Sequence, residues 1–228
     1  MAQGQKPFYL ALGAIAVAGV AFLALRVFGG GTVSIPANVV VTTADTTGFR
    51  GYAIGADAAP IEITEYADYQ CPGCAQSATV EFPDLKARLV ETGKARFRFR
   101  DFPLDGVHTH GRVAAHAAAC ANDQGKFWEM EGTIFQRQND WAPKSDAMGI
   151  FKEIGRAIGL DMVSWQDCME SAKYAGRIQA AKDEGVALGV GSTPSFVIGG
   201  RIYPGLSSDQ MVTLVDSLIA AQAGTPAK

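Results

Sequence analysis

Two cysteines separated by two residues, Cys71 and Cys74, have the spacing that most directly predicts chemistry in this chain. The Cys-Pro-Gly-Cys tetrapeptide follows the apolar run 61–69 and precedes a stretch of helical periodicity over 75–91, so it lies where a predicted strand passes into a predicted helix. Pro72 suits the first helical turn, where its missing N–H is no loss. The helix N-terminus favours the Cys71 thiolate, which is the species that attacks disulfides. The motif therefore predicts reversible disulfide exchange.

A zinc site is the alternative interpretation of a CxxC pair. Zinc usually needs four ligands, often from a second CxxC or from two histidines at short spacing. The other cysteines, Cys120 and Cys168, stand far apart, and the three histidines (His108, His110 and His116) form no such pair. We therefore expect redox chemistry at the CxxC, with no metal and no organic cofactor, because thiol–disulfide exchange needs only the sulfur atoms.

The N-terminal segment predicts a membrane anchor. Lys6 and Arg26 enclose nineteen uncharged residues. A helix of that length spans about 28 Å at ~1.5 Å per residue, which is close to the hydrocarbon thickness of a bilayer. We interpret residues 1–28 as an uncleaved signal anchor that forms one transmembrane helix. A cleavable signal peptide is the alternative, although its apolar core usually has only about 7–15 residues.

The remainder of the chain reads as a tether followed by one domain. Residues 29–47 are glycine-rich at first and then polar, and residues 48–224 are enough for a single domain with a sizeable core. Four cysteines, an even number, suit an oxidising compartment. Lys6 favours a cytoplasmic N-terminus, although Arg26 opposes it. We expect a single-pass protein of the cytoplasmic membrane whose domain faces the periplasm or exterior. A net charge of −3 without a basic cluster argues against nucleic acid as a partner.

The order of the predicted elements gives the fold class. A second strand is expected at 95–102, a long helical region at about 107–188, two hairpin strands at 195–198 and 201–203, and a last helix at 207–221. This last helix begins with the capping-box spacing of Ser207 and Gln210. A β-α-β half, a helical insertion and a β-β-α half together predict an α/β thioredoxin fold with a helical domain placed inside it.

Three stretches of the chain occur in the order and spacing of one known family. They are IEITEYADYQCPGC (residues 61–74), QGKFWEM (124–130) and GVGSTPSFVIG (189–199). They resemble the DsbA-like thioredoxin-fold family of extracytoplasmic thiol–disulfide oxidoreductases, in its membrane-anchored branch. The resemblance implies that the substrates are unfolded or reduced exported proteins. It also implies that the enzyme is reoxidised by a quinone-linked membrane thiol oxidase of the DsbB or vitamin K epoxide reductase type.

The resemblance also implies roles for individual residues. Cys71 would be the exposed nucleophile, Cys74 the buried resolving thiol, and Pro194 a cis-proline beside the disulfide. A cis bond there would leave the backbone groups of Thr193 able to pair with an extended substrate. Glu65 lies where many relatives keep a buried acid, so it would accept the proton of Cys74. The alternative for Glu65 is a partly exposed structural residue at a strand end.

The two cysteines outside the CxxC lie in predicted helices of the insertion. With Cys71 and Cys74 paired locally in an oxidising compartment, the natural remaining pair is Cys120–Cys168. This disulfide would close a loop of about fifty residues and contribute ~3–4 kcal/mol in the chain-entropy picture. The alternative is two reduced cysteines that act as small buried hydrophobic residues. Related anchored family members carry a comparable structural bridge.

The dipeptide between the active-site thiols bears on the direction of electron flow. Pro72-Gly73 lacks the histidine of the most oxidising relatives, a residue that stabilises the reduced thiolate. We expect an oxidase that donates disulfides to exported proteins. The alternatives are a disulfide reductase or isomerase, and a non-catalytic, chaperone-like module that binds peptides and keeps its CxxC as a static bridge.

Overall fold

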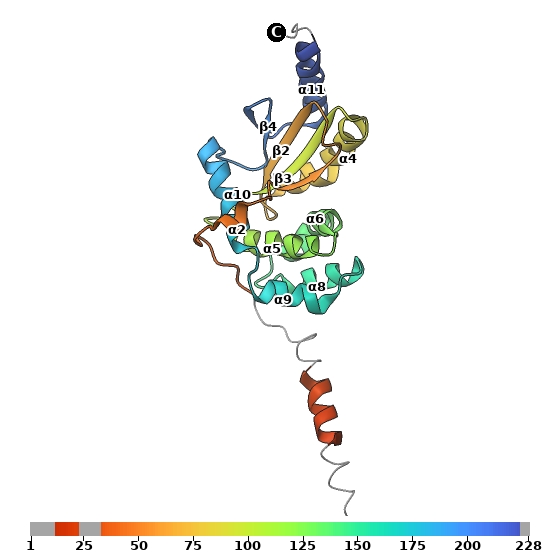
Figure 1. The fold of residues 1–228 in the computed structure, drawn as a ribbon, viewed down its shortest axis with the longest axis vertical. Helices are drawn as coiled ribbons and strands as arrows, with labels where there is room; N and C mark the ends of the chain where they lie inside the picture. The colour runs from red at the N-terminus through yellow and green to blue at the C-terminus, as the bar shows by residue number, and fades with distance from the viewer. Residues whose placement is uncertain (1–11, 23–32, 224–228) are drawn as a thin grey trace, which may run out of the picture.

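A five-stranded sheet organises the computed structural model, which describes residues 12–22 and 33–223 (Figure 1). The strand order is β1-β3-β2-β4-β5. Strands β2 and β3 are parallel, and the other neighbours are antiparallel. The strands are β1 (Tyr52–Ile54), β2 (Ile61–Ala67), β3 (Ala95–Asp101), β4 (Ser195–Ile198) and β5 (Arg201–Pro204). The predicted thioredoxin fold is thereby confirmed, with β1 added at one edge.

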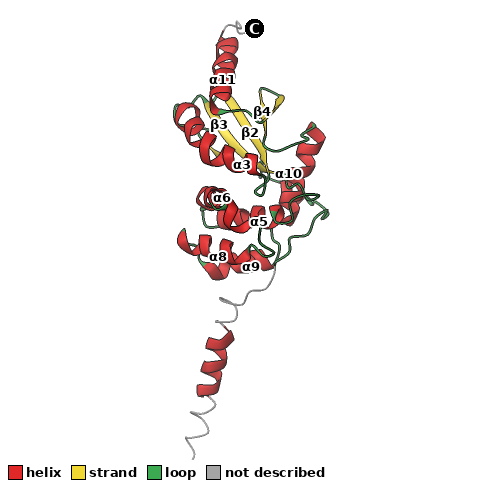
Figure 2. Ribbon diagram, turned by 180° about the vertical axis from the view of Figure 1, so that it is seen from behind, coloured by secondary structure: helices red, strands yellow, loops and turns green. Residues whose placement is uncertain are grey.

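The helix that begins at the CxxC runs from Pro72 to Val90 and changes its winding along the way. It consists of α3 (Pro72–Gln76), η1 (Ser77–Glu81), α4 (Phe82–Leu85) and η2 (Lys86–Val90), where η marks π-helical turns. A proline inside a helix cannot donate its backbone hydrogen bond, and π-turns are one way in which helices accommodate such interruptions. Leu85 and Leu89 are buried against the sheet at a spacing of four residues. The helix therefore holds the CxxC firmly over the sheet (Figure 2).

The helical insertion between β3 and β4 forms a second lobe. Its helices are α5 (Gly111–Asn122), α6 (Phe127–Gln136), α7 (Gln138–Trp141), α8 (Met148–Ala157), α9 (Met162–Glu170) and α10 (Ala175–Leu188). Figures 1 and 2 show α5, α6, α8 and α9 stacked below the sheet, while α10 returns beside it. Helix α5 is buried on nearly all sides, and alanine is its most frequent residue. The predicted insertion is confirmed.

Aromatic rings fix the insertion to the sheet. Phe127 of α6 stacks on Tyr52 with 3.5 Å between ring centroids, and Phe135 stacks on Tyr69 at 4.8 Å. Phe99 of β3 lies near both phenylalanines, at 5.8 and 6.4 Å. These contacts bury large apolar areas on both sides, and ring pairs add about 0.5–1.5 kcal/mol each. Helix α6 is therefore the part of the insertion that lies directly on the core of the catalytic lobe.

The last helix, α11 (Ser208–Ala223), begins with the predicted capping box. The Ser207 backbone N–H donates to Gln210 Oε1 at 2.9 Å, and the Gln210 N–H donates to Ser207 Oγ at 3.4 Å. Met211 and Val215 are the buried apolar residues of this helix. The capping box thus sets where the chain turns from β5 into the helix.

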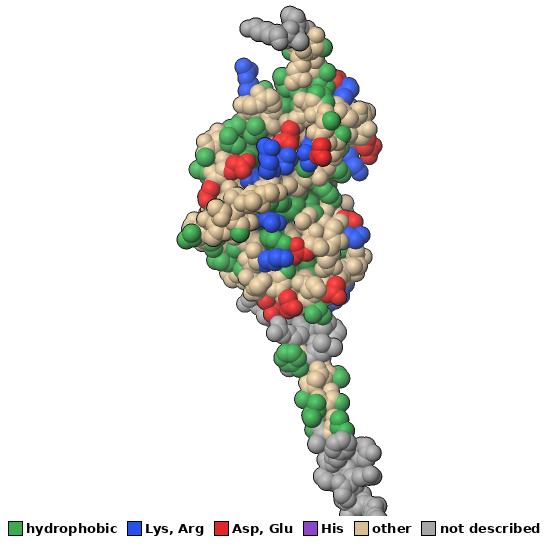
Figure 3. Space-filling view, in the orientation of Figure 1, with side chains coloured by type: hydrophobic (Ala, Val, Ile, Leu, Met, Phe, Trp, Pro, Cys, Tyr) green, Lys and Arg blue, Asp and Glu red, His purple; other side chains and the backbone are tan. Residues whose placement is uncertain are grey.

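The outer face of the sheet is charged. Successive residues of a strand alternate between faces, so Arg96, Arg98 and Arg100 of β3 all lie on the face opposite to Phe97 and Phe99. They form ion pairs with acidic partners: Arg96 with Asp57, Arg98 with Glu62 and Arg100 with Glu184. Figure 3 shows basic and acidic side chains gathered over this face. The alternating side chains of β3 thus separate a charged face from the core.

Residues 33–47, part of the predicted tether, pack against the insertion. Ile35 is buried, and the Asn38 N–H donates to Gln179 Oε1 of α10 at 3.0 Å. The short helix α2 (Thr43–Thr46) lies on the same helix. Residues 12–22 are also helical, whereas residues 1–11 and 23–28 of the predicted anchor lie outside the described residues. Among the residues that the structure describes, no helix has the length and apolar character needed to cross a membrane.

Candidate active site

The two thiols of the CxxC differ in exposure because of their places at the start of α3. Cys71 is the N-cap residue of the helix and is half-buried, whereas Cys74 lies in the first turn and is 1% exposed. The backbone N–H groups of Cys74 and Ala75 each donate to the Cys71 carbonyl oxygen at 3.1 Å. A second molecule can therefore reach the Cys71 sulfur, while the Cys74 sulfur is enclosed.

The same placement separates the pKa values of the two thiols. A hydrogen bond from the Cys74 thiol is the main cause that lowers the pKa of Cys71, to about 5, against the opposing effect of burial. The Thr193 side chain and the backbone N–H groups of Cys74 and Gly73 lower it further. Burial, followed by the Cys71 hydrogen bond and the Glu65 charge, raises the pKa of Cys74 well above its usual range. The reduced site therefore holds one thiolate and one thiol.

The loop before β4 closes over the thiols. The Thr193–Pro194 peptide bond is cis, and the Cys71 sulfur lies 3.3 Å from the Thr193 carbonyl oxygen. A Cβ atom on Gly73 would lie 3.2 Å from Pro194 Cδ and 3.8 Å from Cys71 Sγ. Glycine thus allows the dipeptide between the thiols to approach the proline loop closely. The structure brings together Cys71, Gly73, Thr193 and Pro194.

A groove of about 230 Å³ opens beside this loop. Its lining includes Gly73 and Pro194, Leu206 from the loop before α11, Gln210 from α11, and Glu81 from η1. Glu81 Oε2 accepts the Ser208 N–H at 2.7 Å, so this carboxylate also helps to hold the end of α11. The groove thus opens beside the dipeptide that separates the two thiols.

Glu65 lies in β2 beneath the thiols and is 3% exposed. Ser77 Oγ donates to Glu65 Oε1 at 2.8 Å. Burial raises the pKa of Glu65 to about 7, opposed by the Ser77 hydrogen bond and assisted by the Cys71 charge. A carboxyl group that titrates near neutral pH and acts on the pKa of Cys74 is suited to exchange a proton with that thiol. The partly exposed position considered for Glu65 is wrong.

Glu65→Gln should slow the release of a mixed disulfide by Cys74 by roughly two orders of magnitude at neutral pH. Only the ionised carboxylate accepts a proton, so the wild-type rate should rise with pH through about 7, and the variant should lose this rise. Stopped-flow kinetics across pH 5–8 measure it. Glu62→Gln, on the opposite face of the same strand, is the matched control. An unchanged pH profile in Glu65→Gln would make Glu65 a structural residue only.

Three polar residues that the sequence analysis missed hold the backbone around the thiols. Gln138 of α7 donates through Nε2 to the carbonyl oxygens of Tyr69 and Cys71, at 2.8 and 3.0 Å. Gln70 accepts the His110 N–H at 2.8 Å. Asp68 accepts the Leu104 N–H at 2.6 Å. Asp68 and Gln70 stand directly before the CxxC in the sequence, which was a usable signal, whereas nothing marked Gln138.

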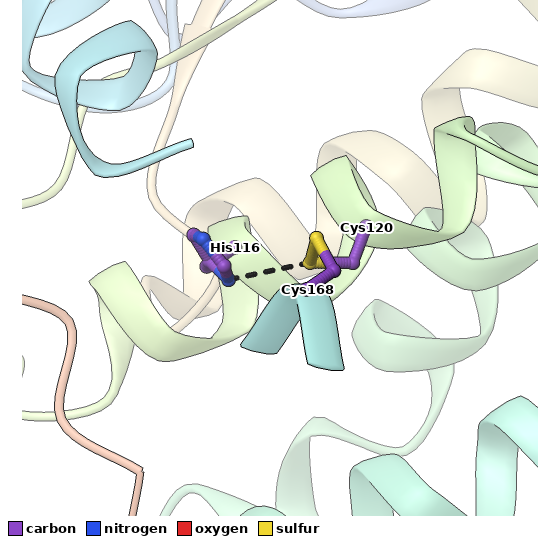
Figure 4. A group of neighbouring side chains, drawn as sticks. All are labelled: His116, Cys120 and Cys168. Atoms are coloured by element: carbon purple, nitrogen blue, oxygen red, sulfur yellow. Dashed lines mark hydrogen bonds between the residues drawn. A yellow bond between two sulfur atoms is a disulfide. The ribbon is translucent and has the colours of Figure 1, made fainter. Parts of the chain in front are cut away.

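Cys120 and Cys168 form a disulfide that joins α5 to α9, with Cα atoms 5.8 Å apart (Figure 4). His116 lies one turn before Cys120, and its Nδ1 is 3.4 Å from the Cys120 sulfur. The Tyr174 N–H donates to His116 Nε2 at 3.0 Å, and burial lowers the pKa of His116 to about 4. Neutral His116 therefore carries its proton on Nδ1, directed at sulfur. Within the described chain, these three residues are a candidate metal-binding group, but both sulfurs are committed to the disulfide.

Residues 49–217 match the family model described as Thioredoxin, so the chain belongs to the thioredoxin family. Chlamydia trachomatis DsbA has a similar fold, with a TM-score of 0.68 and 19% identity over 82% of this chain and 100% of that one. A thioredoxin-like oxidoreductase from Silicibacter pomeroyi gives a TM-score of 0.59 and 26% identity over 76% and 93%. The fold of this chain is thus that of the thioredoxin family and is similar to the fold of a DsbA protein.

Curated relatives are of two kinds. The Na(+)/H(+) antiporter NhaA 3 of Salinispora tropica is 31% identical over 68% of this chain but over only 22% of its own length. A probable disulfide bond formation protein D of Bacillus anthracis is 26% identical over 66% of this chain and 70% of its own length. The chain thus spans about a quarter of the length of the antiporters and most of the length of the disulfide bond formation protein.

Proposed function

We propose that this protein is an extracytoplasmic thiol oxidase that transfers its Cys71–Cys74 disulfide to exported proteins. The observation that carries the proposal is the lowered pKa of the half-buried Cys71 thiol beside the raised pKa of the buried Cys74 thiol. Stabilising the reduced thiolate makes the corresponding disulfide a better oxidant. The name of the Bacillus relative, which matches over most of its length, supports the same assignment.

The proposed reaction is a pair of thiol–disulfide exchanges. A substrate thiolate attacks Cys71 Sγ, the enzyme disulfide breaks, and Cys74 leaves and takes a proton from Glu65. A second substrate thiolate then attacks the substrate sulfur of the mixed disulfide, and Cys71 leaves as a stabilised thiolate. The substrate loses two electrons as its disulfide forms, and the enzyme gains them as two reduced sulfurs. The Thr193 backbone at the cis-proline would pair with the extended substrate.

The proposal includes the cellular setting expected from the sequence. Residues 1–28 act as the membrane anchor, residues 29–47 lead from it, and residues 48–224 form the catalytic domain on the periplasmic or exterior side. A quinone-linked membrane thiol oxidase of the DsbB or vitamin K epoxide reductase type would reoxidise Cys71 and Cys74. The uncharged length of residues 7–25 and the four cysteines support this setting. Ion transport is not proposed, because the antiporters match over a quarter of their length.

Equilibration of the reduced protein with glutathione buffers tests the direction of electron flow. Because the pKa of Cys71 is about 5, between the thioredoxin and DsbA extremes, we expect a reduction potential between about −120 and −230 mV. A value near the −270 mV of thioredoxin, to within about 20 mV, would contradict the oxidase and favour a reductase. A CxxC disulfide that does not exchange with glutathione would favour the static bridge of a peptide-binding module.

A further inference from the structure

A second buried carboxyl group, Glu131, lies beneath the CxxC pair and takes no part in the reaction just described. Glu131 is 5% exposed and stands in the middle of α6. Phe127 and Phe135 lie four residues before and after it, so the three side chains share one face of the helix. Both rings contact Phe99 of β3, with centroids at 5.8 and 6.4 Å. Glu131 therefore lies between the two rings, on the face of α6 that covers Phe99.

The register of the sheet puts Glu65 next to this place. Glu65 of β2 pairs directly with Phe99 of β3, and neighbouring strands are about 4.8 Å apart. Side chains of paired residues point to the same face of the sheet, so Glu65 and Phe99 both point toward α6 and the CxxC helix. Consistent with this proximity, the Glu65 charge acts on the pKa of Glu131. Two carboxyl groups from different lobes thus meet in one apolar region.

Several other titratable groups surround Glu65 and Glu131. Cys71 and Cys74 approach from α3, Asp101 from β3, and Tyr52 and Tyr69 from the edge of the same core. Burial raises the pKa of Asp101 to about 7, and the Tyr69 hydroxyl has no hydrogen-bond partner among the described residues.

Glu131 itself meets no charge that would favour its ionisation. Burial first, and the Glu65 charge second, raise the pKa of Glu131 well above its usual range, and no cationic side chain of the described residues offsets them. Glu131 therefore keeps its proton to a higher pH than an exposed glutamic acid does, and a neutral acid has an O–H to donate.

We propose that Glu131 is a positioning residue for Glu65. The protonated carboxyl group of Glu131 donates a hydrogen bond to the Glu65 carboxylate whenever Glu65 carries a negative charge. A buried carboxylate is costly without donors, and the observed donor to Glu65 is the single hydroxyl of Ser77. Glu131 supplies a second donor as the anion forms. The inference rests on the proposed function, because it concerns the carboxylate that exchanges a proton with Cys74.

Two substitutions at Glu131 separate this role from a structural one. Glu131→Met keeps most of the side-chain volume but removes the hydrogen-bond donor. It should therefore raise the pKa of Glu65 by about one unit, which lowers the ionised fraction of Glu65 about tenfold at pH values below that pKa. Glu131→Gln remains a neutral donor and should leave the Glu65 titration within a few tenths of a pH unit of wild type.

The experiment is a ¹³C NMR titration of the Glu65 carboxyl carbon in the full chain, alongside the pH profile of mixed-disulfide release. The wild-type inflection is expected near 7. Glu131→Met should move both profiles upward, with release about tenfold slower at pH 6. Glu131→Gln should restore both profiles. Glu129→Met, at a half-exposed position of the same helix, is the matched control and should move neither.

Several outcomes would overturn the inference. An unmoved Glu65 titration in Glu131→Met contradicts it, and so does an equal shift in the Met and Gln variants. If Glu131→Met does not fold, Glu65→Gln gives a second test, because loss of the Glu65 charge should lower the pKa of Glu131. If the titrations shift as expected while no change at Glu65 affects exchange, the carboxyl pair stands and the proposed role of Glu65 fails.

Discussion

Cys71→Ser should reduce thiol–disulfide exchange by roughly 10³-fold or more, because no other described thiol is both accessible and ionised. In the reduced wild type at pH 6, Cys71 should be about nine-tenths thiolate, one pH unit above its pKa of about 5. The raised pKa of Cys74 keeps that thiol protonated. Iodoacetamide should therefore label Cys71 far faster than Cys74, as measured by mass spectrometry of timed samples.

The complementary variant shows which thiol resolves the intermediate. Cys74→Ser should accumulate mixed disulfides with substrate proteins, since the attacking Cys71 remains and the resolving thiol is gone. Cys71→Ser should accumulate few. The Cys120→Ser, Cys168→Ser double variant, which alters two cysteines far from the groove, is the matched control and should keep most of the activity per folded molecule. Equal alkylation rates for Cys71 and Cys74 would contradict the assignment of the nucleophile.

The same double variant, Cys120→Ser, Cys168→Ser, should lower the free energy of unfolding by ~3–4 kcal/mol. The disulfide closes a loop with a sequence separation of 48 residues, and chain entropy in the unfolded state rises when that closure is lost. Denaturant unfolding with linear extrapolation measures the change. The Cys71→Ser, Cys74→Ser double variant removes as many sulfurs without opening a long loop, so it should lose much less. A loss below about 1 kcal/mol would show that the disulfide hardly constrains the unfolded chain.

Regular patterns in the sequence predicted the core of the fold. The strand at 195–198 has the predicted bounds, since the Gly-Gly turn marks its end clearly, and the helical region expected at about 107–188 contains α5 to α10. The CxxC lies at the predicted passage from strand to helix. Strand β1 was missed because three residues are too few to show alternation. The π-helical turns around Pro83 were missed because no periodic pattern distinguishes them from an α-helix.

Contacts between the lobes could not be predicted in the same way. Glu131 stands in an amphipathic helix, where a charged residue indicates the solvent side, yet it faces the core between two phenylalanines. Its location depends on how the insertion packs on the sheet, and this packing cannot be predicted from the periodicity of a single sequence. Gln138 was missed for the same reason. Residues 33–47 looked like a linker by composition, but Ile35 finds a buried site on the insertion.

The two hydrogen bonds from Gln138 make the insertion part of the redox couple. Its amide holds the carbonyl oxygen of Cys71 across a sequence separation of 67 residues, at the residue that caps the active-site helix. A change of redox state that moves this carbonyl changes the free energy of holding α7 in place. By thermodynamic reciprocity, a displacement of α7 changes the free-energy difference between dithiol and disulfide by the same amount. The reduction potential of the site is thus a property of both lobes. A partner that binds only the insertion can therefore still change how readily the Cys71–Cys74 disulfide is reduced.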